Sequence, residues 1–494
     1  MTGGSVIGVC IGEATPGEVG FISREMPVTG EYVTLEFEDT RVLGMVEGLV
    51  RGSPAISGDI IDPDVVERIL KFEGSGGQYV RGRVRLLGDV KDLRIPKVPP
   101  PPGTKILRAD TETLRQLFST GTVRIGTLLS NPEVEVKLDA NMMVSRHLAI
   151  LAITGAGKSN TVSVIVEGLI GLEGMPIIFD MHSEYGDAGF TSVKKIAPRL
   201  NPVYLSFAEF KMLVDVGKDA YIQERLLRKA FKAAKAGMKG RGSFIEKILR
   251  KLEEKADSEE LKTGSEKNAI AGVINKVEDF ENKYEGLIDP HAPHILDQLE
   301  QGKANVIDLG SVDEDYADVI VSHILRRTLY KRKTGDMPPV FCIIEEAHIL
   351  APAKRPTHSK YWIDRIAREG RKFGVGLCLV SQRPKSLDQN SLSQANNTII
   401  MRLVEPSDQR HVQQSSERLS DDLLAQLSSL NIGEAIILGL MTKIPALVKI
   451  DKYPGKIKGT DPDITKEWKR TAQKQRQIKK QKKAEVNDLY TNII

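Results

Sequence analysis

The stretch that decides the fold is His147-Leu148-Ala149-Ile150-Leu151-Ala152-Ile153-Thr154-Gly155-Ala156-Gly157-Lys158-Ser159. The apolar run 147–153 predicts a buried strand, and the run 160–172, which follows the Lys-Ser pair, is compatible with a helix. A strand, a glycine-bearing loop, Lys-Ser and a helix together make a P-loop. Such a loop binds phosphate because successive backbone N–H groups and the helix N-terminus both attract anions. Ala152 stands where the first glycine is usual, and a small residue suffices to start the turn.

The P-loop predicts how ATP is held. Lys158 reaches the β- and γ-phosphates, and the Ser159 hydroxyl holds Mg²⁺. Further ATP contacts are expected from Gly155, Ala156, Gly157 and Asn160.

Two further apolar runs predict strands that end at the same site. The run 340–344 is followed by Glu345 and Glu346, and the run 374–380 is followed closely by Gln382. Parallel strands buried on both faces are continuously apolar, and their C-terminal ends line the site of such sheets. Beside the P-loop, Glu345 would support Mg²⁺ and Glu346 would polarise the attacking water. Gln382 would sense the γ-phosphate or orient that water.

The composition indicates a globular protein of two or three domains. The chain has 494 residues and a formal net charge of only +4, so any surface that binds nucleic acid must be local. The three cysteines, Cys10, Cys342 and Cys378, lack metal-ligand spacing, which fits a reducing compartment. We find no signal-peptide pattern and no apolar run near the ~18 residues that a membrane span needs. We therefore expect a cytoplasmic protein without a membrane anchor.

Changes in composition divide the chain into five segments. Residues 1–103 contain short strand patterns with glycine turns, which predict a small β-barrel, and end in a proline-rich linker at 96–103. Charged helix patterns without strand signals fill 206–303 and predict an inserted helical bundle. The α/β ATPase core is expected on both sides of this insertion, at 104–205 and 304–451.

The last segment, 452–494, is strongly basic. From Thr465 to Glu485 the sequence has only two acidic residues, Glu467 and Glu485. The basic residues in the same stretch are Lys466, Lys469, Arg470, Lys474, Arg476, Lys479, Lys480, Lys482 and Lys483. Such a run is typical of a solvated tail. Nucleic-acid binding and docking on a neighbouring subunit remain as alternatives.

Several motifs occur together with the P-loop in one order. They are Arg146-His147, Asp180-Met181-His182-Ser183-Glu184-Tyr185, Glu345-Glu346-Ala347-His348, Arg368-Glu369-Gly370-Arg371-Lys372-Phe373-Gly374 and Ser381-Gln382-Arg383-Pro384. With them, nearly the whole chain resembles the HerA family of hexameric DNA translocases, within the HerA–FtsK group of RecA-like motor ATPases. The resemblance implies a RecA-like P-loop NTPase core and a homohexameric ring that couples ATP hydrolysis to movement along double-stranded DNA. It also implies work with a NurA-type nuclease in DNA end resection and recombinational repair.

The resemblance further implies an active site between subunits. Arg371 and Arg146 match basic positions that contact nucleotide phosphates, one of them from the adjacent protomer, and Arg368 is a third candidate. An arginine supplied in trans stabilises the charge on the transferred phosphoryl group. Lys449 and Ile450, in the last strand pattern, are expected to cover the nucleotide base.

Other charged residues have candidate roles in the metal site or in DNA binding. Asp180 ends a strand pattern beside the P-loop, which suggests the metal or water shell, whereas His182 and Glu184 suit the same site, a DNA-facing loop or a local structural pairing. A motor must bind any sequence through phosphates. The candidates for the ring's pore are Lys354, Arg355 and Lys360, which could equally be ordinary surface residues.

Two rival functions stay open. One is a related motor that pumps protein or conjugative DNA at a membrane, and the other is a non-motor P-loop scaffold. Glu346, Gln382 and the candidate arginines form a full hydrolytic set, which a switch need not carry. The absence of a Leu-Ser-Gly-Gly-Gln signature from the sequence argues against an ABC-type ATPase.

Overall fold

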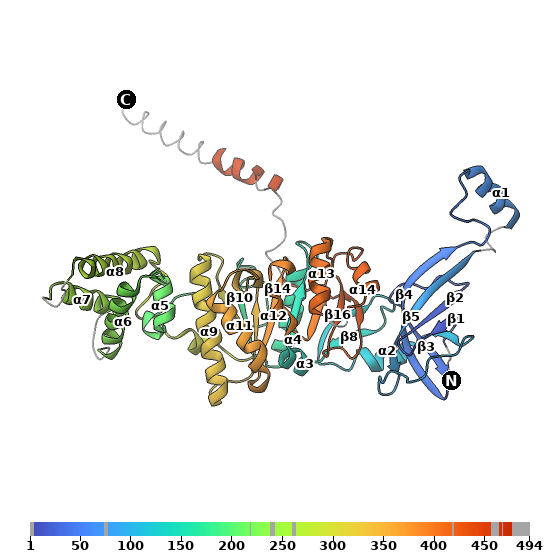
Figure 1. Cartoon of the computed structure of the whole chain (residues 1–494), viewed down its shortest axis with the longest axis horizontal. Coiled ribbons are helices and arrows are strands. Elements are labelled where there is room, and N and C mark those ends of the chain that lie inside the picture. Colours follow the sequence, from blue (N-terminus) through green and yellow to red (C-terminus); the bar gives the residue numbers. More distant parts are fainter. Residues whose placement is uncertain are drawn as a thin grey trace, which may run out of the picture.

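The computed structural model describes residues 4–73, 78–217, 219–237, 243–258, 263–416, 419–455, 464–466 and 468–476. Its main parts lie in a row, with a helical bundle at one end, a mixed α/β core in the middle and a β-barrel at the other end (Figure 1). Among the helices described, none is both long and apolar enough to cross a membrane.

The N-terminal part is a closed barrel with the strand order β1-β2-β5-β4-β3-β6. Its strands are β1 (Val6–Ala14), β2 (Glu18–Ser23), β3 (Tyr32–Phe37), β4 (Thr40–Gly52), β5 (Tyr79–Asp89) and β6 (Lys105–Arg108). The alternating side chains of these strands fill a separate apolar core around Phe21 and Leu35. The helix α1 (Pro63–Glu73), which the sequence analysis does not predict, lies between β4 and β5 and projects away from the barrel (Figure 1).

The proline-rich segment does not end the barrel. β6 follows it and pairs with both β1 and β3, so the last barrel strand runs to Arg108. The predicted end of this domain, at residue 103, therefore lies before the strand that closes the barrel. The other boundaries, after residues 205, 303 and 451, stay predictions.

The core is an 11-stranded sheet in the order β11-β12-β10-β13-β14-β9-β15-β16-β17-β7-β8. From β11 to β15 all neighbours are parallel, and from β15 to β8 all are antiparallel. The parallel strands are β9 (Leu148–Leu151), β10 (Pro176–Asp180), β11 (Val193–Ile196), β12 (Ala304–Asp308), β13 (Val340–Ile344), β14 (Val375–Ser381) and β15 (Asn397–Ile400). The remaining strands are β7 (Val123–Leu128), β8 (Glu135–Leu138), β16 (Glu434–Leu438) and β17 (Ala446–Ile450).

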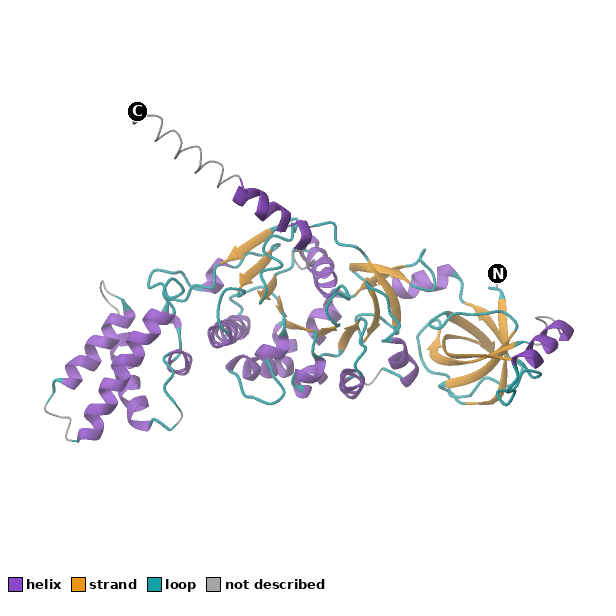
Figure 2. Ribbon diagram, turned by 90° about the horizontal axis from the view of Figure 1, so that it is seen from above, coloured by secondary structure: helices purple, strands orange, loops and turns teal. Residues whose placement is uncertain are grey.

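Helices cover this sheet on both faces (Figure 2), which explains why β9, β10, β13 and β14 are buried along their whole length. The longest are α4 (Lys158–Gly171), α9 (Glu314–Thr334) and α11 (His358–Glu369). The shorter α-helices of the core are α2 (Thr111–Phe118), α3 (Ala140–Arg146), α10 (Ala347–Leu350), α12 (Gln389–Ser393), α13 (Pro406–Ser415) and α14 (Asp421–Gln426).

A helical bundle is inserted between β11 and β12, as predicted. It consists of α5 (Phe207–Leu213), α6 (Tyr221–Ala236), α7 (Phe244–Ala256) and α8 (Gly264–Lys283). A capping box starts α5 at Ser206 and another starts α7 at Ser243, which satisfies N–H groups in the first turn of each helix. Phenylalanines from all four helices pack on one another in its core: Phe210, Phe231, Phe244 and Phe280.

The described part of the basic tail is helical over 464–466 and 468–476. The side chains of Lys469, Arg470, Lys474 and Arg476 are exposed there. Lys479, Lys480, Lys482 and Lys483 lie outside the described residues.

Candidate active site

The P-loop connects the end of β9 to the start of α4. Gly155 and Gly157 have left-handed φ angles of 78° and 109°, which side chains rarely adopt. A Cβ atom on Gly157 would also lie 3.1 Å from the Met401 side chain. Ala152 needs neither a left-handed φ nor the absence of a Cβ atom, because it is buried and continues the strand. Its N–H donates to the Ser381 carbonyl at 3.3 Å. The departure from glycine at this position therefore leaves the loop intact.

Five parallel strands end at the edge where this loop lies. β9 leads into the P-loop, β10 ends at Asp180, β13 leads to Glu345 and Glu346, and β14 and β15 end beside them. β14 lies between β9 and β13, so residues almost two hundred positions apart in sequence face each other across one strand. The ammonium Nζ of Lys158 lies 2.6 Å from Glu346 Oε1 and 3.3 Å from Glu345 Oε2.

This contact makes Lys158 a well-defined cation. Burial lowers the pKa of the ammonium group, but the attraction of Glu345 and Glu346 outweighs burial and raises the pKa above its usual value. Lys158 therefore stays charged at the edge of the sheet, ready to bind an anion.

The two glutamates differ in their surroundings. Glu345 is fully enclosed and accepts a hydrogen bond from the Tyr185 hydroxyl. Burial raises the pKa of Glu345, and the attraction of Lys158 offsets only part of that rise. At Glu346 burial also opposes ionisation, but His348 and Lys158 outweigh it and lower the pKa to about 2. Glu346 is therefore ionised at neutral pH.

Glu346 is also held in an unusual backbone conformation. Its φ is 46°, in the left-handed region, and it directly precedes α10. One carboxylate oxygen contacts Lys158, and the other, Oε2, lies 3.2 Å from Nδ1 of His348. Within the described chain no group donates a well-aligned hydrogen bond to this buried Oε2. An ionised carboxylate oxygen whose hydrogen-bonding capacity is not filled can accept a proton or orient a water molecule.

Oxygen ligands for a divalent cation gather next to Lys158. The Ser159 hydroxyl donates to Glu184 Oε2 at 2.6 Å, and Glu345 Oε2 lies 3.3 Å from Lys158 Nζ. Hydroxyl and carboxylate oxygens are the ligands that Mg²⁺ prefers. The described residues contain no group of three or more His, Cys, Asp or Glu spaced to hold a metal by themselves. Mg²⁺ is usually held by one or two side chains together with water and substrate phosphates.

Asp180 lies at the same edge but is engaged by its own loop. Its carboxylate accepts from the backbone N–H groups of His182, Glu184 and Tyr185 at 3.3, 3.0 and 2.8 Å. These bonds shape the loop that presents Glu184 to Ser159 and Tyr185 to Glu345. A direct metal contact of Asp180 stays a prediction.

Gln382 faces the P-loop as the sequence analysis expects. The Thr154 hydroxyl donates to Gln382 Oε1 at 2.5 Å. Arg402, which is not among the predicted site residues, also borders the loop. Its carbonyl accepts from Ile153 N at 3.1 Å, and its side chain is exposed. Its signal in the sequence is an arginine within the apolar run 398–403, at the end of a predicted core strand.

The chain after β17 is joined to the helix that follows the P-loop. The Asn160 amide donates to the Asp451 carbonyl at 2.8 Å and accepts from Tyr453 N at 2.8 Å. Lys449 and Ile450, at the end of β17, are thereby brought beside the P-loop. Asn160 thus has a structural role here in addition to its expected contact with ATP.

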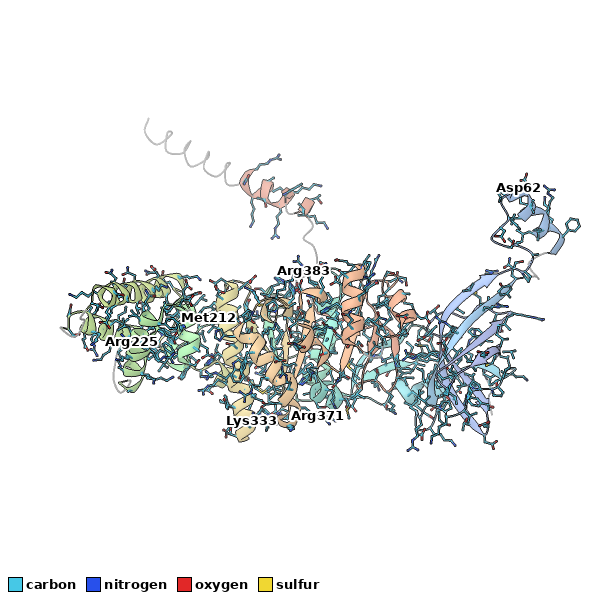
Figure 3. The ribbon with its side chains drawn as sticks, in the orientation of Figure 1. Asp62, Met212, Arg225, Lys333, Arg371 and Arg383 are labelled. Carbon is cyan, nitrogen blue, oxygen red and sulfur yellow. The ribbon has the colours of Figure 1, made fainter. Side chains whose placement is uncertain are left out.

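Arg146 and Arg371 lie at the opposite edge of the sheet. Arg146 precedes β9, and Arg371 lies in the 3₁₀ turn η4 (Gly370–Phe373) that precedes β14. Figure 3 places Arg371 at one edge and Arg383, just after β14, at the other. A strand therefore separates each arginine from the P-loop of its own chain.

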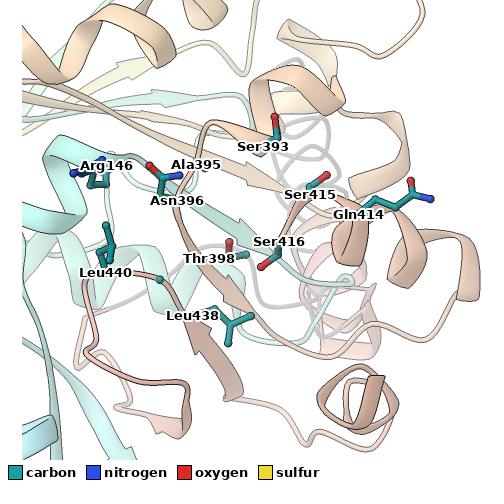
Figure 4. Close-up of a pocket in the computed structure, with 11 residues that line it drawn as sticks. Arg146, Ser393, Ala395, Asn396, Thr398, Gln414, Ser415, Ser416, Leu438 and Leu440 are labelled. Atoms are coloured by element: carbon teal, nitrogen blue, oxygen red, sulfur yellow. The ribbon is translucent and has the colours of Figure 1, made fainter. Parts of the chain in front are cut away.

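Neither arginine has an acidic partner among the residues described, whereas Arg368 forms an ion pair with Asp364. Arg146 also lines a pocket that contains Asn396 and Ser415 (Figure 4). Arg146 and Arg371 are therefore available to an anion that is not bound by their own P-loop.

Comparison with known proteins assigns the chain to a family. The family model of the helicase HerA central domain matches residues 123–328, and that of the HAS barrel domain matches residues 7–92. The "DNA double-strand break repair helicase HerA" of Saccharolobus solfataricus is 41% identical over 493 residues, which covers 95% of this chain and 97% of that protein. The protein of the same name from Sulfurisphaera tokodaii is 42% identical over 485 residues, with 94% and 97% covered. The chain belongs to the HerA helicase family.

Membership in the HerA family confirms the expected P-loop NTPase fold and makes the chain an ATP-hydrolysing helicase or translocase. The structure of VirB4 from Thermoanaerobacter pseudethanolicus is similar in fold, with a TM-score of 0.50 and 15% identity over 68% of this chain and 98% of that one.

The three basic residues predicted to bind DNA differ in whether their charge is paired with an acidic group of the same chain. Arg355 forms an ion pair with Glu314 at 2.7 Å. Lys360 pairs with Asp388 at 2.9 Å and also donates to a backbone carbonyl, so its charge is largely used inside the fold. Lys354 is exposed, with no acidic partner in the described chain. Lys354 is therefore the candidate best placed to contact a phosphate backbone.

Proposed function

We propose that this protein is an ATP-driven translocase or helicase that moves along double-stranded DNA as a homohexameric ring. The observation that carries the proposal is the contact of Lys158 with Glu346, which unites a phosphate-binding cation and an ionised carboxylate in one site. HerA relatives that align over nearly the whole chain are named as DNA double-strand break repair helicases, which supports DNA as the track.

In the proposed reaction Lys158 changes partners. The ammonium group leaves the two glutamates and binds the β- and γ-phosphates of ATP, together with the backbone N–H groups of Gly155, Ala156 and Gly157. The released carboxylate of Glu346 then orients a water molecule and takes its proton. Gln382, now bonded to Thr154, is positioned to hold the same water or the γ-phosphate.

Mg²⁺ fits this site beside the phosphates. Ser159 would hold it directly, and Glu345 and Glu184 would support it, with Asp180 shaping the loop. When bound, the ion neutralises negative charge that develops on the phosphates. Tyr185 fixes the orientation of Glu345 through its hydroxyl.

The ring completes the site. In a head-to-tail ring the arginine edge of one subunit faces the P-loop edge of the next. Arg371 and Arg146 would then reach the γ-phosphate of the neighbouring subunit, and hydrolysis would depend on assembly. Lys354, with Arg355 and Lys360, would line the pore and contact DNA phosphates.

In the cell we place the protein in the cytoplasm, in DNA end resection with a NurA-type nuclease. Support for the nuclease comes from the family resemblance, and support for the compartment comes from the three cysteines, which are buried free thiols. Co-purification of a nuclease with the tagged full-length protein tests the partnership, and the native mass of the purified protein tests the hexamer.

Duplex-stimulated ATP turnover tests the core of the proposal. We expect ATP hydrolysis to rise when double-stranded DNA is added to the full-length protein, and the Glu346→Gln variant to bind ATP without turning it over. A rate of ATP hydrolysis that does not change when DNA is added would contradict the proposal. It would favour a motor for another cargo or a non-motor scaffold.

A further inference from the structure

A short turn lies against the P-loop on the side away from Glu346. It comprises Asn431, Ile432 and Gly433 and precedes β16. The N–H of Gly433 donates to the Ala156 carbonyl at 2.9 Å. A Cβ atom on Gly157 would lie 3.5 Å from Gly433 N, so the turn and the phosphate loop are in direct contact.

The backbone of this turn is fixed from several directions. Lys449 Nζ donates to the Ile432 carbonyl at 2.8 Å, and Ile450 N donates to the Gly433 carbonyl at 2.8 Å. Glu434 accepts from Asn431 N at 2.9 Å. The turn is therefore joined both to the P-loop and to the end of β17, and its residues have little freedom to move away.

The side chain of Ile432 does not take part in this packing. It is 68% exposed, although its neighbours on both sides hold the main chain in place. A single exposed isoleucine needs no explanation on an ordinary surface. Here its backbone is immobilised one residue from a phosphate loop, where an apolar surface would meet the part of a nucleotide that is not phosphate.

We propose that Ile432 packs against the purine ring of the bound nucleoside triphosphate. The ring is flat and apolar on its faces, and nucleotide sites are lined largely by apolar groups with a few polar ones. Ile432 supplies the apolar contact, and the segment from Lys449 to Asp451, which Asn160 holds beside α4, closes the same side of the site. The proposal rests on the proposed use of ATP and assigns part of the affinity to the base.

The experiment separates the base from the phosphates. Full-length wild type, Ile432→Ala and Ile432→Leu are loaded with a fluorescent ATP analogue labelled on the ribose, which is displaced by ATP or by inorganic tripolyphosphate. Loss of the contact in Ile432→Ala should weaken ATP about five- to tenfold and leave tripolyphosphate within about twofold. Ile432→Leu should stay near wild type. Leu172→Ala, at the far end of α4 and 47% exposed, is the matched control and should change neither ligand.

Two outcomes would overturn the assignment to Ile432. One is unchanged ATP affinity in Ile432→Ala, and the other is an equal loss for ATP and tripolyphosphate, which would mean a disturbed phosphate loop. A wild-type protein whose turnover ignores DNA would contradict the proposed motor function, but the displacement result would still stand, because it requires only nucleotide binding.

Discussion

The two edges of the parallel sheet carry charges in opposite ways. At the C-terminal edge, Lys158 pairs with Glu345 and Glu346, and Ser159 donates to Glu184, so these charged and polar groups have partners within the same chain. At the N-terminal edge, Arg146 and Arg371 have no acidic partner in the described chain. One edge is a nearly complete site, and the other presents cations to something outside.

The difference has a topological cause. Strands of a parallel sheet all end at one edge, so motifs that follow different strands meet there whatever their distance in sequence. Arg146 and Arg371 precede strands, and a single chain has no means of bringing them to the same nucleotide. We therefore expect the two edges to meet only between subunits.

The largest effect should come from the arginine edge. Arg371→Ala should lower ATP turnover by about 10³–10⁵-fold if this arginine stabilises the transferred phosphoryl group. Arg368→Ala, whose side chain is paired with Asp364, is the matched control and should change turnover little. Steady-state ATP hydrolysis with saturating duplex measures both, and Arg146→Ala examined alongside shows which arginine matters more.

Co-assembly tests whether the two edges belong to different subunits. Rings formed from equal amounts of Lys158→Ala and Arg371→Ala should regain about a quarter of the sites, because an intact P-loop can then face an intact arginine. If both residues served the same subunit's nucleotide, the mixed rings would be as inactive as either variant alone.

A second large effect is expected from the P-loop edge. Glu346→Gln keeps the shape but removes the charge, and should lower turnover about 10²–10⁴-fold while ATP binding persists. Glu281→Gln, on the exposed surface of α8, should behave as wild type. A Glu346→Gln protein that turns over ATP normally would show that another group activates the water.

A moderate effect should come from Tyr185→Phe. Removing the hydroxyl leaves Oε1 of buried Glu345 without the hydrogen bond that orients it, which should raise the Mg²⁺ concentration needed for half-maximal turnover by about tenfold. Tyr32→Phe is the matched control because it also loses a buried hydroxyl bond, to the Pro445 carbonyl at 2.7 Å. Equal Mg²⁺ dependence in the two variants would leave Tyr185 with a purely structural role.

The smallest effect concerns stability. Burial lowers the pKa of His147 to about 4, and the neutral ring accepts from Leu377 N and bonds the Ala367 carbonyl. The unfolded chain, with a pKa near 6.5, binds more protons, so stability should fall as the pH drops from about 6.5 towards 4, by about 3 kcal/mol in total.

Thermal midpoints at pH 7 and pH 4.5 measure this fall. His147→Gln should melt lower at pH 7 and lose part of the pH dependence. His294, whose pKa burial also lowers to about 4, should account for a further part of it. An undiminished fall in His147→Gln would assign the effect elsewhere.

Much of the fold could be predicted from local patterns. The apolar runs that form β9, β10, β13 and β14 are easily recognised in the sequence. Strands covered on both faces are continuously apolar and do not alternate between apolar and polar residues. The long helices of the insertion follow from their apolar spacing and capping residues. The edge strand β11, with the sequence Val-Lys-Lys-Ile, is not predicted, because a short, charged strand has no such signal.

The barrel shows the limit most clearly. The proline-rich segment predicts a domain boundary before β6. Only the pairing of β6 with β1 and β3 shows that Lys105–Arg108 belongs to the barrel. Closure of a barrel is a contact between distant strands, so the local sequence of β6 does not encode it.

The sequence alone determined the chemistry of the site: a lysine and serine for phosphate and cation, paired glutamates after a buried strand, and a glutamine after the next. Those roles follow from residue type and from the rule that parallel strands end together. The tertiary structure decided which groups touch. It placed His348 beside Glu346, which lowers the pKa of that carboxylate relative to Glu345. It also brought Tyr185 to Glu345 and Glu184 to Ser159, and it left Arg146 and Arg371 at the opposite edge of the sheet. Burial and proximity set the charge of a side chain, and both depend on the packing of segments that are remote in sequence.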